Sequence, residues 1–349
     1  MGRLRSAVVE ITNRCNLRCV HCASSSGMAR PGELSLEEIM SLAGDLRALG
    51  CESVTLLGGE IFLRRGWEEV ALRIRDLGME LTVVTNGLLV DGAVADTLAS
   101  IEPGVVGVSV DGATRDSYRA ARGADGFEAS MRAIALLQAA GLPEVNAITC
   151  FHRGNIGDFE RFVDLFAGTA VNWQVQIAGK GGDRFPDDLF LTADDYRTLV
   201  SGILEAKASR RDLRLSTMDD IGYFPLLPAP ASIAEWDGCQ AGISAIGIRS
   251  NGEVLPCLSL GDAFVVASTR RAPLASIWAD DAAFEPFRHK ERHLAGACAE
   301  CDVRGRCRGG CTEIARSATG GIGEDPYCLR AIERARLTAL IAGDAGRET

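Results

Sequence analysis

The chain has 349 residues, which at about 100–200 residues per domain predicts about two domains with enough length to bury a substantial core. Hydrophobic residues make up 47% and charged residues 24%, proportions that exclude a disordered or fibrous protein. The formal charge of -10 disfavours nonspecific nucleic-acid or anionic-membrane binding, and no apolar run is long enough for a membrane span. Segment 1–11 lacks the apolar core of a secretory signal. We therefore expect a cytoplasmic protein with no nucleic-acid or membrane partner.

Short apolar, β-branched runs alternate with amphipathic stretches over the first two thirds of the sequence, a pattern typical of a parallel sheet covered by helices. The intervening helices include residues 35–49, which begin with the capping-box pair Ser35 and Glu38, and residues 127–140, and the sixth begins at Thr192. Six β-α units fall short of the eight of a closed barrel, so we expect an α/β fold with an open, partial (β/α)6 barrel of TIM type. Its chemistry should collect at the carboxyl ends of the strands. The predicted strands are residues 7–11, 53–57, 80–85, 105–110, 145–150 and 173–177.

The twelve cysteines are informative because ten of them fall in clusters or paired spacings. In a cytosolic chain of this size, such clusters indicate metal ligation rather than a disulfide framework. Cys51 follows a helix-to-strand junction and Cys150 ends a predicted strand. We interpret both of these isolated cysteines as small buried hydrophobic residues.

The loop after the first predicted strand carries Cys15, Cys19 and Cys22 in a C-x3-C-x2-C spacing. Three thiolates this close can hold three irons of a 4Fe-4S cluster and leave the fourth iron open to another ligand. A structural zinc site normally needs four protein ligands, but no fourth cysteine lies nearby and His21 lies between two of the ligands. The spacing therefore favours an iron-sulfur cluster over zinc.

With Gly58-Gly59-Glu60 after the second predicted strand, this three-cysteine run resembles the radical S-adenosylmethionine (SAM) enzymes. The resemblance implies that SAM binds the open iron through its amino and carboxylate groups. Glycines let the backbone approach the methionyl part of SAM, and Glu60 or the adjacent carbonyls accept hydrogen bonds from its amino group. Many relatives have proline after the glutamate, where this chain has Ile61.

Three further segments match the same family: Thr85-Asn86-Gly87 and Ser109-Val110-Asp111-Gly112, which end the third and fourth predicted strands, and Arg122-Gly123. The resemblance implies that a serine and an arginine contact the SAM carboxylate and ribose, and that the residue before the third cysteine lies against the adenine. The residues that we expect to bind SAM are His21, Gly58, Gly59, Glu60, Thr85, Asn86, Ser109, Asp111 and Arg122.

Simpler roles are open for some of these residues. Ser109 could be a cap, Arg122 a solvated charge and His21 a packing residue. Three amides are weaker candidates for the mouth of the barrel: Asn155, Gln174 and Gln176.

The last third of the sequence is rich in cysteine. Residues 246–256 predict a hairpin with an Asn-Gly turn that presents Cys257. The cysteine spacing resembles the SPASM extension of radical SAM enzymes, which carries auxiliary iron-sulfur clusters. We therefore expect a partial barrel over residues 1–212, a bridging segment over 213–236 and a small, cysteine-rich α+β auxiliary-cluster domain over 237–349. The seven cysteines of the pattern are Cys239, Cys257, Cys298, Cys301, Cys307, Cys311 and Cys328.

By the resemblance, two auxiliary 4Fe-4S clusters share these seven cysteines. Cys298, Cys301, Cys307 and Cys328 hold the outer cluster, and Cys239, Cys257 and Cys311 hold the inner one. The inner cluster then keeps one iron free or takes a ligand other than cysteine. It could bind a substrate heteroatom or accept the electron left after hydrogen abstraction. A zinc or purely structural cluster fold is the alternative for this region.

The resemblance also implies the reaction. An electron enters the first cluster, SAM splits into methionine and a 5′-deoxyadenosyl radical, and the radical abstracts a hydrogen from a substrate over the barrel mouth. Auxiliary clusters favour a net oxidation, with a thioether or carbon-carbon crosslink, a decarboxylated residue or a carbonyl as product. Segment 15–27 resembles mycofactocin-type peptide maturases, whereas Leu258 occupies the place of an aspartate in sulfatase-maturing enzymes. We therefore expect an oxidoreductase that modifies a ribosomally made peptide and receives electrons from a flavodoxin- or ferredoxin-type reductant.

Several alternatives are open. No winged-helix segment for leader recognition precedes the first predicted strand, so we expect a separate leader-binding protein or recognition in a groove. A small-molecule substrate is another possibility. Cys150 also leaves peptide epimerisation open, because some epimerases quench the substrate radical with a thiol. A non-catalytic iron-sulfur electron carrier is the least favoured interpretation.

Overall fold

The computed structural model describes residues 2–218, 221 and 236–345, with side chains as far as residue 341. Its strands form a ten-stranded sheet in the order β10-β9-β8-β1-β2-β3-β4-β5-β6-β7. Strands β1 to β7 pair in parallel with their neighbours, and β8 joins the free edge of β1, also in parallel. The strands are β1 (Ser6–Glu10), β2 (Ser53–Leu57), β3 (Glu80–Thr85), β4 (Val105–Ser109), β5 (Val145–Phe151), β6 (Asn172–Ile177), β7 (Arg214–Thr217), β8 (Ala245–Ile248), β9 (Glu253–Leu255) and β10 (Ala267–Ser268).

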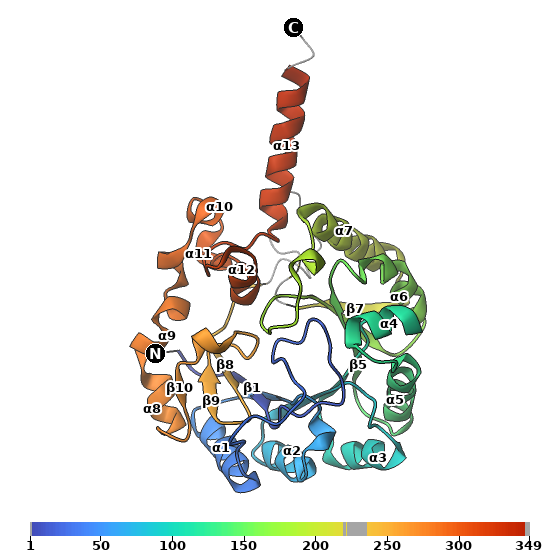
Figure 1. The fold of residues 1–349 in the computed structure, drawn as a ribbon, viewed down its shortest axis with the longest axis vertical. Helices are drawn as coiled ribbons and strands as arrows, with labels where there is room; N and C mark the ends of the chain where they lie inside the picture. The colour runs from blue at the N-terminus through green and yellow to red at the C-terminus, as the bar shows by residue number, and fades with distance from the viewer. Residues whose placement is uncertain (1, 219–220, 222–235, 346–349) are drawn as a thin grey trace.

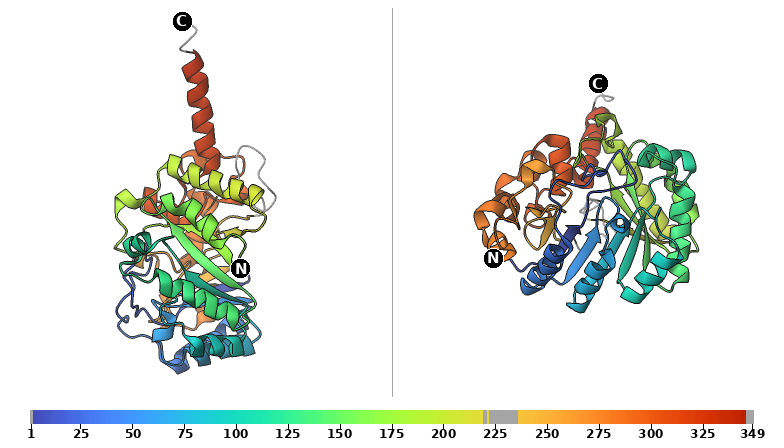
Figure 2. Two further views of the ribbon diagram at one scale, coloured as in Figure 1. Left: turned by 90° about the vertical axis from the view of Figure 1, so that its right-hand side faces the viewer. Right: turned by 60° about the horizontal axis from the view of Figure 1, so that its bottom comes forward.

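Helices that follow the parallel strands cover the outer side of the curved sheet (Figures 1 and 2). The predicted capping box of the first helix is confirmed, since the Ser35 hydroxyl accepts from the Glu38 amide and the Glu38 carboxylate accepts from the Ser35 amide. Thr192 caps the last of these helices in the same way. The helices are α1 (Leu36–Ala48), α2 (Trp67–Asp76), α3 (Gly92–Ile101), α4 (Arg115–Arg122), α5 (Phe127–Ala139), α6 (Phe159–Phe166) and α7 (Ala193–Ser209).

The open barrel predicted from the sequence is confirmed, and all six predicted strands are present with ends that shift by no more than one residue. The structure adds β7 as a further parallel strand at the edge, paired with β6. Three of its four residues are polar, and none is fully buried, so it lacks the apolar run that identifies the inner strands.

An aromatic cluster packs against β5 and β6. Trp173 is fully buried and lies against Phe151, Phe162 and Phe166. Its indole nitrogen donates to the Thr149 hydroxyl at 2.9 Å. Large aromatic side chains bury much apolar area and hold one geometry, so this cluster is expected to set the two strand ends rigidly.

The C-terminal third begins with the predicted hairpin, which is confirmed as the antiparallel pair β8 and β9. Short helices follow, and the last helix extends away from the rest of the molecule (Figures 1 and 2). Most of the predicted bridging segment, 219–220 and 222–235, lies outside the described residues. No helix in the described ranges is long and apolar enough to cross a membrane. The helices of this third are α8 (Leu274–Ala279), α9 (Asp281–Arg288), α10 (Gly296–Ala299), α11 (Arg304–Cys307), α12 (Thr312–Thr319) and α13 (Leu329–Ala345).

Candidate active site at the carboxyl ends of the strands

A cavity of about 370 Å³ lies at the carboxyl ends of the parallel strands, a volume within the range of about 300–1,000 Å³ that is usual for small-molecule sites. The barrel and the C-terminal third both contribute to its wall. The predicted site residues that line it are Cys15, Cys19, His21, Cys22, Gly58, Gly59, Thr85, Asn86, Ser109, Arg122, Cys257 and Cys311.

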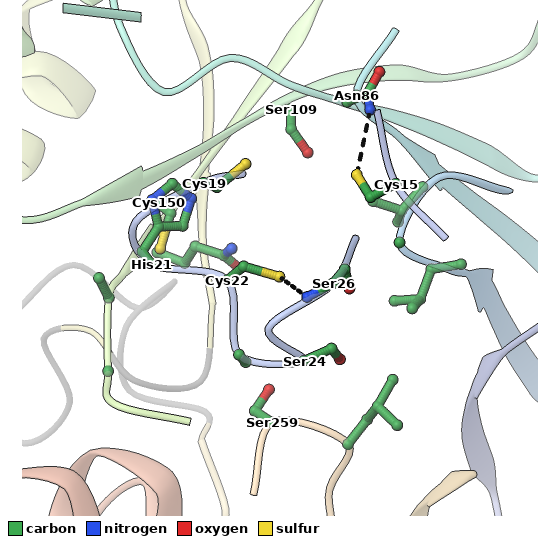
Figure 3. Close-up of a pocket in the computed structure, with 18 of the residues that line it drawn as sticks. Cys15, Cys19, His21, Cys22, Ser24, Ser26, Asn86, Ser109, Cys150 and Ser259 are labelled. Atoms are coloured by element: carbon green, nitrogen blue, oxygen red, sulfur yellow. Dashed lines mark hydrogen bonds between the residues drawn. The ribbon is translucent and has the colours of Figure 1, made fainter. Parts of the chain in front are cut away.

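The three cysteines of the first loop surround the interior of this cavity (Figure 3). Each sulfur accepts a hydrogen bond from nitrogen: Cys15 from the Leu17 amide at 3.4 Å, Cys22 from the Ser26 amide at 3.4 Å, and Cys19 from a guanidinium nitrogen at 3.3 Å. Such N–H···S contacts stabilise thiolates and tune the potential of a bound cluster. The three sulfurs and their N–H donors therefore match a site that binds three irons of a cluster, and this site is open toward the cavity.

Burial opposes the ionisation of two of these thiols, those of Cys15 and Cys19. Burial raises the pKa of the Cys15 thiol to about 11, and burial also raises the pKa of Cys19 despite the nearby cation of Arg122. Metal ligands must be deprotonated, so iron has to displace these protons when it binds.

The glycine motif packs directly on the cysteine loop. The Gly59 amide donates to the Thr12 carbonyl and the Glu60 amide donates to the Arg14 carbonyl, each at 2.7 Å. A Cβ on Gly59 would lie 2.6 Å from the Asn13 carbonyl oxygen, closer than Cβ atoms occur in proteins. Glycine is therefore needed here by the cysteine loop itself, independently of SAM.

Glu60 lies behind the cavity rather than on its wall. Its carboxylate accepts from the Thr85 hydroxyl at 2.8 Å, the Asn86 amide at 2.9 Å and the Phe62 amide at 3.3 Å. The side chain is 1% exposed, and burial raises its pKa although these donors oppose the shift. Glu60 thus ties the glycine motif to the end of β3.

Asp111 is also buried behind the wall and connects two residues that line the cavity. Its Oδ2 lies 3.1 Å from His21 Nε2 and 3.2 Å from Arg122 Nη1, and its Oδ1 accepts from the Cys150 amide at 2.7 Å. Burial opposes ionisation of Asp111, but the Arg122 guanidinium and the His21 ring hold its pKa well below the usual range. Arg122 is 6% exposed, so it is not a solvated surface charge.

Two polar side chains from the strand ends face the same space. Figure 3 shows the Ser109 hydroxyl directed toward the interior, and the side chain makes no hydrogen bond within the described part of the chain, so it is not a cap there. The Asn86 side-chain amide donates to Asn16 Oδ1 at 2.7 Å and to the Cys15 sulfur at 4.0 Å. The structure therefore places polar groups next to the open face of the three-cysteine site.

Of the weaker candidates, Gln176 lines the cavity. Asn155 is buried and donates to the Asp111 and Cys150 carbonyls, which makes it part of the turn after β5. The Gln174 carbonyl accepts from Asn146. Cys150 is 7% exposed and lies on the cavity wall (Figure 3).

Cys51 is buried at the start of β2, where its thiol contacts the Arg5 and Ser53 carbonyls. The predicted role as a small buried residue is confirmed for Cys51.

The auxiliary cysteines form two groups. Cys257 and Cys311 line the central cavity, and Cys239 lies in the same apolar cluster as Cys257 and accepts from the Thr312 hydroxyl at 3.3 Å. Cys298, Cys301 and Cys328 line a second cavity of about 520 Å³. Cys307 is close enough to Cys298 and Cys328 that their charges raise its pKa, although burial is the main cause and brings it to about 11.

Two charged residues on the central cavity were missed by the sequence analysis. Arg184 follows β6 and donates to the Cys19 and Ser26 carbonyls at 3.2 and 3.0 Å. Glu313 lies in the first turn of α12, and burial raises its pKa to about 7. Arg184 belongs to no recognisable motif, and the only local signal for Glu313 is its place two residues after Cys311.

Comparisons with known proteins agree with this geometry. Residues 9–166 match the Radical SAM superfamily and residues 239–302 match SPASM, an iron-sulfur cluster-binding domain. The mycofactocin maturase MftC of Mycolicibacterium smegmatis is 30% identical over 352 residues, covering 97% of this chain and 88% of that protein. The AdoMet-dependent heme synthase of Methanosarcina barkeri is 28% identical over 340 residues, covering 92% of this chain and 95% of that protein.

A solved structure shows the same fold. Streptococcus suis SuiB, bound to the precursor peptide SuiA, superposes with a TM-score of 0.74 over 94% of this chain and 76% of that chain, at 17% identity. The sequence matches extend from the barrel into the cysteine-rich third. The chain therefore belongs to the radical SAM superfamily and carries a SPASM domain.

Proposed function

We propose that this radical SAM enzyme is a peptide maturase that oxidises a residue of a ribosomally made peptide, forming a crosslink or removing a carboxyl group. As a member of its family, the enzyme uses 4Fe-4S clusters and SAM. These cofactors, when bound, supply the electron and the 5′-deoxyadenosyl radical that abstracts a substrate hydrogen.

The observation that carries the proposal is the shared cavity. Cys15, Cys19 and Cys22 of the barrel loop and Cys257 and Cys311 of the C-terminal third all line it. A substrate in this space would lie between the SAM cluster and the inner auxiliary cluster, so the site of hydrogen abstraction would be near a group that can take the remaining electron. This arrangement favours a net oxidation over simple hydrogen return.

The residues of the barrel position and shield the SAM site. We assign the cluster to Cys15, Cys19 and Cys22, and the SAM contacts to His21, Ser109 and the backbone of the glycine motif. Asp111 is paired with the Arg122 guanidinium at 3.2 Å and contacts His21 Nε2 at 3.1 Å, so this buried carboxylate holds the His21 ring in place. Buried ion pairs of this kind fix geometry because each charge is costly to leave alone.

The auxiliary assignment follows the two cysteine groups. We assign the inner cluster to Cys239, Cys257 and Cys311. The second cavity, lined by three of the remaining cysteines with Cys307 nearby, supports the outer cluster assignment. A flavodoxin- or ferredoxin-type protein is the reductant of this proposal.

The peptide substrate is supported by the relatives. MftC is named as a maturase, and SuiB is bound to a precursor peptide. A separate leader-binding protein is part of the proposal.

The test is anaerobic co-expression with a short peptide encoded beside the gene, followed by high-resolution mass spectrometry of the peptide. Wild type should remove two hydrogens or the mass of formic acid, and the triple variant of Cys15, Cys19 and Cys22 to alanine should leave the peptide unchanged. An unchanged mass with wild type calls for deuterium labelling, which detects epimerisation. A peptide that is not oxidised contradicts the proposal, and deuterium label in such a peptide would identify an epimerase instead.

A small-molecule substrate is the second candidate, favoured by the similarity to the AdoMet-dependent heme synthase, which extends over 92% of this chain. Porphyrin-type and peptide substrates are distinguished by incubating the reconstituted enzyme with each and following 5′-deoxyadenosine. The substrate that increases its formation at least about tenfold identifies the class.

A further inference from the structure

The central cavity contains a buried carboxylate that neither the clusters nor the predicted SAM contacts use. Glu313 projects from the first turn of α12 and lines the cavity, and its side chain is 9% exposed. Glu313 lies two residues after Cys311, and both residues line the cavity together with Cys257.

The carboxylate is held in one orientation. The Lys180 amide donates to Ser317 Oγ at 2.7 Å, so the Ser317 hydroxyl directs its proton to Glu313 Oε1, which accepts it at 2.6 Å. This chain of hydrogen bonds joins the loop after β6 to α12. Preorganised polar groups of this kind bind a ligand without first losing side-chain entropy.

The other oxygen lies against a glycine that leaves room for it. A Cβ on Gly179 would overlap Glu313 Oε2, so the carboxylate fills the space where any other residue would carry its side chain. Within the described chain, Oε2 accepts no hydrogen bond and Glu313 forms no ion pair. The Arg316 guanidinium is near enough to act on Glu313 electrostatically, but it forms no ion pair with the carboxylate.

A buried carboxylate without a cationic partner is unfavourable unless a ligand supplies donors. From this geometry we propose that Glu313 binds a cationic group of the substrate, an ammonium or a guanidinium, and so holds the substrate between the two clusters. The inference rests on the proposed function for the identity of the substrate, which would be a peptide with a lysine or arginine side chain or a free N-terminal amine near the modified residue.

The main test is a cycle of enzyme and substrate changes. The peptide encoded beside the gene is prepared with each cationic group neutralised in turn, by N-terminal acetylation or by replacing lysine or arginine with norleucine. With wild type, neutralising one of these groups should lower kcat/KM at least about tenfold, mostly through KM. In Glu313→Gln the same neutralisation should cost less than about threefold, because the partner charge is already absent.

Two variants separate recognition from structural damage. Glu313→Asp keeps the charge and should restore most of the discrimination, whereas Glu205→Gln removes an exposed carboxylate of α7 and should behave as wild type. Iron content and the circular dichroism spectrum check that each variant is assembled. Equal discrimination in wild type and Glu313→Gln would overturn the inference.

A second measurement is independent of the peptide. Ligand-observed NMR titration of the reconstituted enzyme with n-butylammonium and with the neutral n-butanol reports the preference of the cavity for a cation. Wild type and Glu205→Gln should bind the cation at least about tenfold more tightly than the alcohol, and Glu313→Gln should lose this preference. If no peptide is modified but the preference for the cation depends on Glu313, the proposed peptide substrate is wrong and the inference on Glu313 stands. If the preference survives in Glu313→Gln, the inference on Glu313 fails.

Discussion

Arg122 donates a hydrogen bond to the sulfur of Cys19 at 3.3 Å, although the two residues are 103 positions apart in the sequence. The same guanidinium nitrogen lies 3.2 Å from Asp111 Oδ2. Cys19, the proposed cluster ligand, and the buried Arg122–Asp111 ion pair therefore share one nitrogen, which couples the geometry of the three-cysteine loop to the ends of β4 and α4.

Loss of this cation should destabilise the protein. Arg122→Leu leaves the buried Asp111 carboxylate without its guanidinium partner, and breaking such a pair costs about 3 kcal/mol or more. Urea denaturation of wild type and variant measures the difference. The matched control is Arg115→Leu on the same helix, whose partner Asp125 is partly exposed, and its effect should stay within about 1 kcal/mol. If both variants lost the same free energy of unfolding, the buried Arg122–Asp111 pair would contribute no more to stability than the exposed Arg115–Asp125 pair.

A methyl group at Gly59 should displace the cysteine loop. Gly59→Ala would place a carbon 2.6 Å from the Asn13 carbonyl, so the loop must move before a cluster can bind. We expect less iron per chain after anaerobic reconstitution and at least about tenfold slower SAM cleavage. Gly92→Ala at the start of α3, where no atom lies within 4 Å of the new carbon, should retain full iron content. Normal iron and normal SAM cleavage in Gly59→Ala would contradict the packing argument.

Replacement of Glu60 by its neutral isostere should weaken SAM binding. Both carboxylate oxygens accept from backbone amides, those of Phe62 and Asn86, so a glutamine in either orientation sets its NH2 group against an N–H donor. Because Glu60 ties the glycine motif to the end of β3, this mismatch should displace the backbone that we propose to contact SAM. We expect the Kd for SAM to rise at least about tenfold in Glu60→Gln, measured by equilibrium binding to the reconstituted enzyme. Glu37→Gln, an exposed residue of α1, serves as the comparison and should bind SAM as wild type does. An unchanged Kd in Glu60→Gln would show that Glu60 does not support SAM binding.

Iron content should distinguish a proposed cluster ligand from a cysteine that binds no iron. Full occupancy of three 4Fe-4S clusters corresponds to about 12 irons per chain. Cys301→Ala should remove about four irons, and Cys51→Ala should remove none because this thiol lies in the apolar core and donates to backbone carbonyls. Iron analysis with Mössbauer spectroscopy measures both. Retention of all iron in Cys301→Ala would remove this residue from the outer cluster.

Much of the fold was predictable from the sequence because the inner strands are β-branched and apolar. The capping residues Ser35 and Thr192 also placed two helix starts correctly. The edge strand β7 was not found, since its residues are mostly polar. The pairing of β8 with β1 joins segments more than 200 residues apart and leaves no local pattern to read.

The candidate site also contains residues that the sequence predicted and residues that only the structure reveals. The cysteines and glycines stand in motifs with strict spacing, so the sequence located the cavity wall around Cys15 and Gly59. Glu60 and Asp111 are buried behind the cavity wall. Their positions depend on the directions of their side chains, which the spacing of residues in the sequence does not predict. Arg184 and Glu313 reach the cavity from a loop and a helix with no motif of their own, and only the tertiary structure brings them to it.

The most direct test of the account is SAM cleavage coupled to peptide oxidation in one anaerobic reaction. Reconstituted wild type, SAM, dithionite and the peptide encoded beside the gene are mixed, and 5′-deoxyadenosine and peptide mass are followed together. We predict that both products form in proportion and that Cys19→Ala forms neither. Intact SAM in the presence of a fully loaded, reduced wild-type enzyme would contradict the central claim.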